Sequence, residues 1–157
     1  MSSTGAEPLP RTVAWLGYGG LLPFIGLALA TVRANFLGED PQGWNAALLA
    51  YGAVILSFVG ALHWSFAMTL RGLTDDQRTA AFVWSVVPAL VAWVALLVAP
   101  RVAVVLLLVG FLTHYWRDHR LASAAELPAW YLPTRLRLTW VACLCLAEPP
   151  IAQILLR

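Results

Sequence analysis

The segment from Trp44 to Leu70 contains no Asp, Glu, Lys or Arg. A helix needs about 20 apolar residues to cross the ~30 Å hydrocarbon core of a bilayer, and backbone groups inside that core must find their hydrogen bonds within the chain. The segment therefore predicts a membrane-spanning helix. Composition supports this interpretation, because 61% of the residues are hydrophobic and 11% are charged, against roughly 25% charged in ordinary globular domains.

Four other apolar runs are candidates for further spans. We expect five transmembrane helices, at about residues 13–32, 44–70, 80–99, 102–116 and 136–156. Pro100 separates the third from the fourth, since proline cannot continue a helix and disfavours helical geometry at the preceding Ala99. The predicted fold is an all-α integral membrane bundle, with a single transmembrane domain at 13–157 after a polar N-terminal tail at 1–12.

The first apolar run has an alternative interpretation. Arg11, the apolar residues after it and the small residues Ala28–Ala30 also resemble a cleavable signal peptide. The run is long for the apolar part of a signal peptide, and Pro23 interrupts it. We therefore interpret the run as a retained span.

The arginines predict the orientation, because loops on the cytoplasmic side of a membrane carry an excess of Lys and Arg. One side would hold Arg11, Arg71, Arg78, Arg117, Arg120, Arg135 and Arg137, and the other Arg33, Arg101 and Arg157. We expect a bacterial inner membrane protein with a cytoplasmic N-terminus and a periplasmic C-terminus. The polar, proline-containing segment 121–134 should form an interfacial loop or short helix on the cytoplasmic surface.

The second predicted helix has a small face and a bulky face. At about 100° per residue, the small face holds Gly52, Ala53, Leu56, Ser57, Gly60, His63, Trp64 and Ala67. Small residues let helices approach closely in lipid, so this face should point into the bundle. The candidate partners of His63 are Ser57, Tyr18, Glu148 or a carbonyl freed by a proline. The imidazole would either join helices through a hydrogen bond or handle protons or a ligand.

Glu148 is the second ionisable residue in an apolar run, and two prolines follow it. A carboxylate is costly in lipid unless it is protonated, paired or hydrated. One interpretation is a site at a broken helix, as found in transporters. The alternative is that the helix ends near Ala147 and that Glu148 lies at the outer interface.

Basic and aromatic residues gather where the fourth span ends and the fifth begins. They are His114, Arg117, His119, Arg120, Trp130, Tyr131, Arg135 and Arg137. Arginine forks and aromatic rings of this kind suit an anionic lipid headgroup or another phosphate. The alternative is that the arginines only anchor the cytoplasmic side.

The sequence argues against several classes of function. A net charge of +2 does not suggest a nucleic-acid-binding protein. No metal-ligand spacing, phosphate-binding loop or nucleophile motif is present, so we predict no catalytic residue, metal or cofactor. Cys143 and Cys145 would point about 200° apart on a helix, which disfavours a disulfide between them.

Three stretches carry a resemblance to a known family. "YGAVILSFVGALHW" (Tyr51–Trp64), "WSVVPALVAW" (Trp84–Trp93) and "PAWYLPTRLRLT" (Pro128–Thr139) together resemble the transmembrane protein 69-like family. The resemblance implies a small multi-pass membrane protein. The family is one of unknown function, so the resemblance implies no activity, substrate or catalytic residue.

We expect a non-enzymatic membrane protein that binds a lipid or a partner, or that acts in assembly. Its partners would be the bilayer, anionic lipid headgroups, and a second copy or another membrane protein. The candidate binding residues are Ser57, His63, Trp64, His114, Arg120, Trp130, Tyr131, Arg135, Arg137 and Glu148. One alternative is a small proton-coupled transporter that uses His63 and Glu148. Another is an enzyme acting on lipid headgroups, which would need His63 or His114 close to Arg120 or Arg135.

Overall fold

The computed structural model describes residues 8–155, the last seven of them as backbone alone. Within these residues the chain forms α-helices and no strand. The helices are α1 (Arg11–Gly19), α2 (Leu21–Leu37), α3 (Gln42–Thr69), α4 (Asp75–Ala95), α5 (Pro100–Ala124) and α6 (Tyr131–Leu155). The predicted all-α fold is confirmed, and α1 and α2 together occupy the place of the first predicted span.

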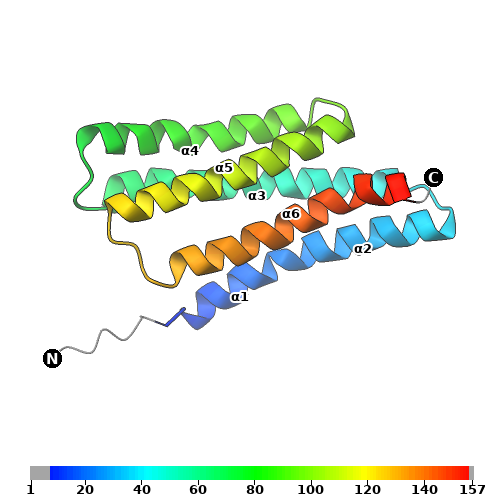
Figure 1. Cartoon of the computed structure of the whole chain (residues 1–157), viewed down its shortest axis with the longest axis horizontal. Helices are drawn as coiled ribbons and strands as arrows, with labels where there is room; N and C mark the ends of the chain where they lie inside the picture. Colours follow the sequence, from blue (N-terminus) through cyan, green and yellow to red (C-terminus); the bar gives the residue numbers. More distant parts are fainter. Residues whose placement is uncertain (1–7, 156–157) are drawn as a thin grey trace.

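Successive long helices run in opposite directions, so the start of α1 and the end of α6 lie at opposite ends of the bundle (Figure 1). Among the described residues, three stretches are long and apolar enough to cross a membrane, at Arg11–Leu37, Gln42–Thr69 and Asp75–Ala95. Helices α5 and α6 lie where the fourth and fifth spans were predicted. That all five predicted spans cross a membrane remains a prediction.

The break between α1 and α2 falls at Gly20. Pro23 explains its position, because a proline ring lacks a hydrogen-bond donor and clashes with the carbonyl four residues before it, here that of Gly19. The hydroxyl of Tyr51 on α3 donates a hydrogen bond to the carbonyl of Gly20 over 2.8 Å. The break is therefore tied to α3.

Helix α3 contacts α2, α4, α5 and α6, and it packs most extensively on α4. The predicted small face is largely buried there, with His63 among its buried residues. A Cβ atom added to Gly60 would lie 2.8 Å from Cβ and Cγ of Pro88, which is buried inside α4. Two predicted members depart from the pattern: Trp64 is half exposed, and Ser57 bonds the carbonyl of Ala53 in its own helix.

The α4–α5 hairpin confirms the interpretation of Pro100. Helix α4 ends at Ala95, and Pro100 is the first residue of α5. That position suits proline, since the first N–H groups of a helix have no partner within it. Helix α4 is shifted relative to the predicted span 80–99: it begins already at Asp75 and ends at Ala95, because the turn begins at Leu96.

The prediction that residues 121–134 form an interfacial loop or short helix was wrong. Helix α5 continues to Ala124 and α6 begins at Tyr131, so the connection is confined to residues 125–130. Tyr131 is 8% exposed and thus belongs to the bundle interior rather than to a headgroup layer. The helix extends because the buried face that includes His114 continues past the predicted span, at Asp118 and Leu121.

The outward faces of the helices are rich in large apolar side chains. Leu29, Phe58, Val83, Val105 and Leu144 are each more than half exposed. Apolar surface on this scale marks contact with lipid or with another protein. The interior is filled by apolar residues of α2, α3, α5 and α6 such as Phe24, Leu56, Leu107 and Leu146.

Candidate functional site

The partner of His63 is Asp118, a residue of α5. The Nε2 atom of His63 lies 2.9 Å from Oδ1 of the Asp118 carboxylate. The two side chains are 2% and 0% exposed. The expected partners Ser57, Tyr18 and Glu148 were wrong, because an acidic group from a neighbouring helix takes that nitrogen.

Asp118 also joins α5 to α6. Nε of Arg135 donates to its Oδ2 atom over 2.9 Å, and the hydroxyl of Tyr131 donates to Oδ1 over 3.3 Å. His114 lies one helical turn before Asp118, with its Nε2 atom 3.7 Å from Oδ1. We call His63, His114, Asp118, Tyr131 and Arg135 the polar cluster.

The polar cluster is buried, and this decides its charge state. Removing a charge from water is costly unless the charge is paired and hydrogen-bonded. Asp118 and Arg135 compensate each other, so both can remain ionised.

Two groups of the polar cluster, Asp118 and Tyr131, have shifted pKa values, and both lie outside the predicted spans 102–116 and 136–156. Burial raises the pKa of Asp118, but the hydrogen bond from His63 and the charge of Arg135 outweigh it and hold the pKa below its usual value. Burial raises the pKa of Tyr131, and the charge of Asp118 raises it further.

The hydrogen-bond donor Trp84 fixes the ring of His114. The indole Nε1 atom of Trp84 lies 3.1 Å from Nδ1 of His114. An indole N–H can only donate, so Nδ1 accepts, and the neutral ring carries its hydrogen on Nε2. That Nε2 atom is buried, has no hydrogen-bond partner among the described residues and faces the Asp118 carboxylate.

His63, His114 and Asp118 also offer three possible metal-ligand atoms within 4.8 Å of one another. Their hydrogen bonds argue against a metal site. A carboxylate can only accept, so Nε2 of His63 carries a hydrogen, as Nε2 of His114 does. A metal-bound histidine usually donates from its other nitrogen to an acceptor, whereas Trp84 presents a donor. The arrangement fits a hydrogen-bonded cluster better than a metal centre.

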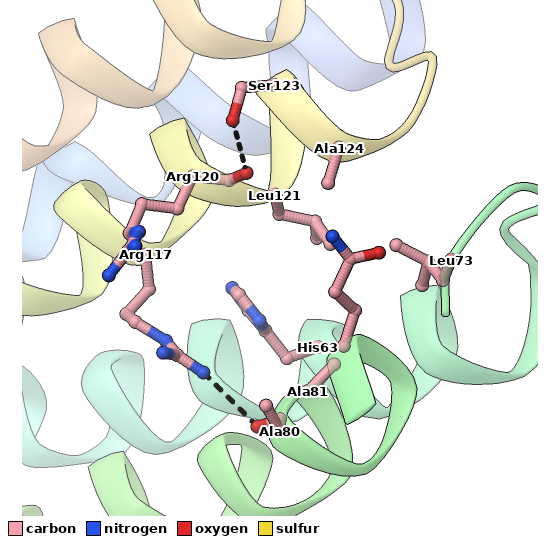
Figure 2. Close-up of a pocket in the computed structure, with 10 residues that line it drawn as sticks. His63, Leu73, Ala80, Ala81, Arg117, Arg120, Leu121, Ser123 and Ala124 are labelled. Atoms are coloured by element: carbon pink, nitrogen blue, oxygen red, sulfur yellow. Dashed lines mark hydrogen bonds between the residues drawn. The ribbon is translucent and has the colours of Figure 1, made fainter. Parts of the chain in front are cut away.

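A pocket of about 400 Å³ lies beside the polar cluster, between the start of α4 and the end of α5. Its lining consists of His63, Leu73, Gln77, Ala80, Ala81, Arg117, Arg120, Leu121, Ser123 and Ala124. Figure 2 shows the imidazole of His63 rising from α3 into this space, with Arg117 and Arg120 beside it. We call it the cationic pocket, since it combines two guanidinium groups with an imidazole.

Each arginine of the cationic pocket is held by an aromatic ring. The guanidinium of Arg117 lies 5.0 Å from the ring centre of Trp84 and donates to the carbonyl of Ala80 over 3.2 Å. The guanidinium of Arg120 lies 4.9 Å from the ring centre of Trp116. Partial burial and the like charge of Arg120 lower the pKa of Arg117. An anion between the two groups would relieve that repulsion.

The remaining predicted site residues lie elsewhere. Trp64 packs edge-on against Phe82. Trp130 packs edge-on against Tyr131, and its buried indole nitrogen has no hydrogen-bond partner in the described part of the chain. Arg137 is exposed and donates to the hydroxyl of Tyr18 over 3.4 Å. Thus, of the predicted basic residues, Arg117 and Arg120 line the pocket. His114 and Arg135 are buried in the polar cluster.

Glu148 belongs to the opposite end of the bundle. It lies inside α6, which continues to Leu155, so the interpretation that the helix ends near Ala147 was wrong. Arg135 and Glu148 are separated by about 20 Å along the helix at 1.5 Å per residue. Glu148 is therefore not a partner of His63.

Sequence reasoning missed Asp118, the centre of the polar cluster. A signal was present, because Val104, Leu107, Phe111, His114, Asp118 and Leu121 recur at the three- and four-residue spacing of one helix face. Ending the fourth span at Trp116 removed Asp118 from this pattern. It was then masked by its basic neighbours Arg117 and Arg120.

The fold and the site together define a helical membrane protein with a buried polar cluster at one end of its bundle. Comparison with known proteins identifies the family. The family described as "Protein of unknown function (DUF3429)" matches residues 9–148, and the chain belongs to it.

One relative is the "Transmembrane protein 69" of Xenopus tropicalis. It is 34% identical over 142 residues, which cover 85% of this chain and 51% of the relative. The chain thus spans about half the length of this curated relative. The resemblance to the transmembrane protein 69-like family is confirmed, and no solved structure matches the chain.

Proposed function

We propose that this membrane protein binds the phosphate headgroup of an anionic lipid in its cationic pocket. The observation that carries the proposal is the joint lining of one pocket by Arg117, Arg120 and His63. Two guanidinium groups provide charge and planar hydrogen-bond donors that suit phosphate oxygens. The pocket volume of about 400 Å³ falls within the range of roughly 300–1,000 Å³ that is usual for small-molecule sites.

The polar cluster acts as the rigid base of this pocket. His63 belongs to both, since it lines the pocket and donates to Asp118. Asp118 in turn is hydrogen-bonded to Arg135 of α6. The pocket wall on α5 and its floor on α3 are thereby held in a fixed relation by charge-assisted hydrogen bonds, which are stronger than neutral ones.

Lipid binding by the full chain in nanodiscs tests this function. Native mass spectrometry would compare phosphatidylglycerol with phosphatidylcholine for the parent and for the double variant Arg117→Gln/Arg120→Gln. Each basic residue near a membrane surface contributes about 1 kcal/mol to the attraction of anionic lipid. The double variant should therefore lose about 30-fold in affinity for the anionic lipid.

The matched control is Arg137→Gln. Arg137 is exposed on α6 and lies outside the pocket lining. The Arg137→Gln variant removes one positive charge without changing the pocket, and it should leave most of the preference for anionic lipid. Equal retention of both lipids by the parent, or an undiminished preference in the double variant, would reject the proposed function.

The same proposal extends to the membrane in which the protein lies and to its orientation there. A bacterial inner membrane with the N-terminal end in the cytoplasm would expose the cationic pocket to the cytoplasmic leaflet, which is rich in anionic lipid. The distribution of arginines supports this orientation. The relative named above is a vertebrate protein, so reporter fusions to each end of this chain in bacterial cells are the direct test.

A further inference from the structure

His63 is surrounded by charged and titratable groups whose sum is positive. They are His114, Asp118, Arg117 and Arg120 on α5 and Tyr131 and Arg135 on α6, while α4 contributes the uncharged Gln77, Ala80 and Ala81. The charges of Asp118 and Arg135 cancel. With a neutral His63, the excess positive charge beside the ring is that of Arg117 and Arg120.

The hydrogen bond to Asp118 fixes which nitrogen of His63 is free. The carboxylate can only accept, so Nε2 of His63 donates to it over 2.9 Å. Nδ1 of the neutral ring then carries the lone pair, and it makes no hydrogen bond within the described part of the chain. Since the ring lines the cationic pocket, Nδ1 is the atom that a pocket ligand can reach.

A proton on Nδ1 would turn this acceptor into a donor. It would also place a third positive charge beside two arginines, which is unfavourable while the pocket holds no anion. A bound anion reverses that balance. The carboxylate of Asp118 on the opposite side of the ring would stabilise the imidazolium, as a carboxylate does in a histidine–aspartate pair.

We propose that the cationic pocket selects a phosphate monoester, and that His63 takes up one proton when the monoester binds. This inference rests on the proposed function and deepens it. A monoester carries a charge of −1.5 to −2 near neutral pH, whereas a phosphodiester carries −1. Three positive groups match the monoester better. Phosphatidic acid presents this group on a lipid, and glycerol 3-phosphate presents it in solution.

At pH 7.5 the monoester is mostly the dianion, so the proton comes from the solvent, and no covalent bond is made or broken. In the complex, Nδ1–H donates to one phosphate oxygen while Nε2–H still donates to Asp118. Arg117 and Arg120 bind the remaining oxygens. Selectivity for the monoester and uptake of the proton are two consequences of the same arrangement.

Calorimetry on the full chain in nanodiscs tests the proposal. Phosphatidic acid or phosphatidylglycerol would be delivered at pH 7.5 in two buffers of different ionisation enthalpy, so that the buffer dependence of the heat counts the protons taken up. We expect phosphatidic acid to bind about 10- to 100-fold more tightly than phosphatidylglycerol, as one charge-assisted hydrogen bond provides. Proton uptake should accompany the monoester alone.

The variant His63→Gln keeps an amide that can donate to Asp118 and removes the ring nitrogen that would take up the proton. It should reduce the preference for the monoester to near unity and abolish the proton uptake. If His63→Gln keeps both the preference and the proton uptake, this inference is wrong although the proposed function stands. If neither lipid depends on Arg117 and Arg120, the proposed function fails first.

A second measurement does not depend on the variant. In the parent chain with ¹⁵N-labelled histidine, phosphatidic acid should convert one of the three histidine rings from the neutral to the doubly protonated form. Phosphatidylglycerol should not. Conversion by glycerol 3-phosphate at equal concentration would identify the soluble monoester as the ligand source. Unchanged histidine spectra with every monoester would overturn the inference.

Discussion

Asp118 is the residue on which the polar cluster depends. Its carboxylate accepts hydrogen bonds from His63 and Tyr131, and from Arg135, whose charge it balances. Arg135 is 7% exposed, so replacement of Asp118 by leucine leaves a buried guanidinium without a counter-charge. Breaking a buried pair in this way costs about 3–5 kcal/mol. We expect a loss of that size in the free energy of unfolding for Asp118→Leu.

The complementary variants separate charge from packing. Arg135→Met should also cost about 3–5 kcal/mol, since it leaves the Asp118 carboxylate uncompensated. The double variant Asp118→Leu/Arg135→Met buries no unpaired charge, so its main cost is the orphaned donors of His63 and Tyr131, about 1–3 kcal/mol each. It should therefore be more stable than Asp118→Leu, which orphans the same donors and leaves Arg135 unpaired as well, and its loss should fall well below the sum of the two single losses.

The assay is reversible unfolding of the full chain in mixed micelles by increasing sodium dodecyl sulfate, followed by the fluorescence of its eight tryptophans. Glu126→Gln is the control, because Glu126 is an exposed acid in the α5–α6 connection. Single variants that lose less than about 1 kcal/mol, or a double variant that loses the sum of the two, would refute the assigned charge pairing.

Three further predictions concern the packing and the chemistry of the bundle. Gly60→Ala should cost about 1–3 kcal/mol relative to Gly43→Ala in the same unfolding assay, because its Cβ would clash with Pro88 whereas Gly43 has open space; equal stabilities would contradict the close approach of α3 and α4. Tyr51→Phe should cost about 0.5–1.5 kcal/mol through loss of the hydrogen bond to Gly20, and a variant as stable as the parent would contradict that bond. Elemental analysis of the purified protein should find no stoichiometric transition metal, and a metal bound to the polar cluster would overturn its interpretation as a hydrogen-bonded network.

The sequence determined the helices better than it determined their contacts. The small face around Gly60 and the break at Pro100 follow from local rules, one for helix periodicity and one for proline geometry, and both agree with the structure. The inward direction of His63 follows from the same periodicity. These features depend only on residues that are close together in the chain.

The partner of His63 depends instead on which helices are neighbours. Asp118 is 55 residues away in the chain, and helix periodicity alone does not say that the end of α5 meets the end of α3. The extent of α5 was also underestimated, since hydropathy falls where His114 and Asp118 replace apolar residues on the buried face. A polar residue at an inward position marks the continuation of a helix as well as an apolar one does.

The placement of the polar groups bears on the transporter hypothesis. The cationic pocket reaches His63 from the end of the bundle where α5 ends, whereas Glu148 lies about 20 Å farther along α6. Between them the core is largely apolar, with Leu56, Leu107, Phe111 and Leu146, and the buried hydroxyl of Thr139 makes no hydrogen bond among the described residues that could continue a proton path. A proton bound by His63 would therefore return to the side from which it came. This arrangement suits a binding site open to one side of the membrane, and it gives no support to proton-coupled transport between His63 and Glu148.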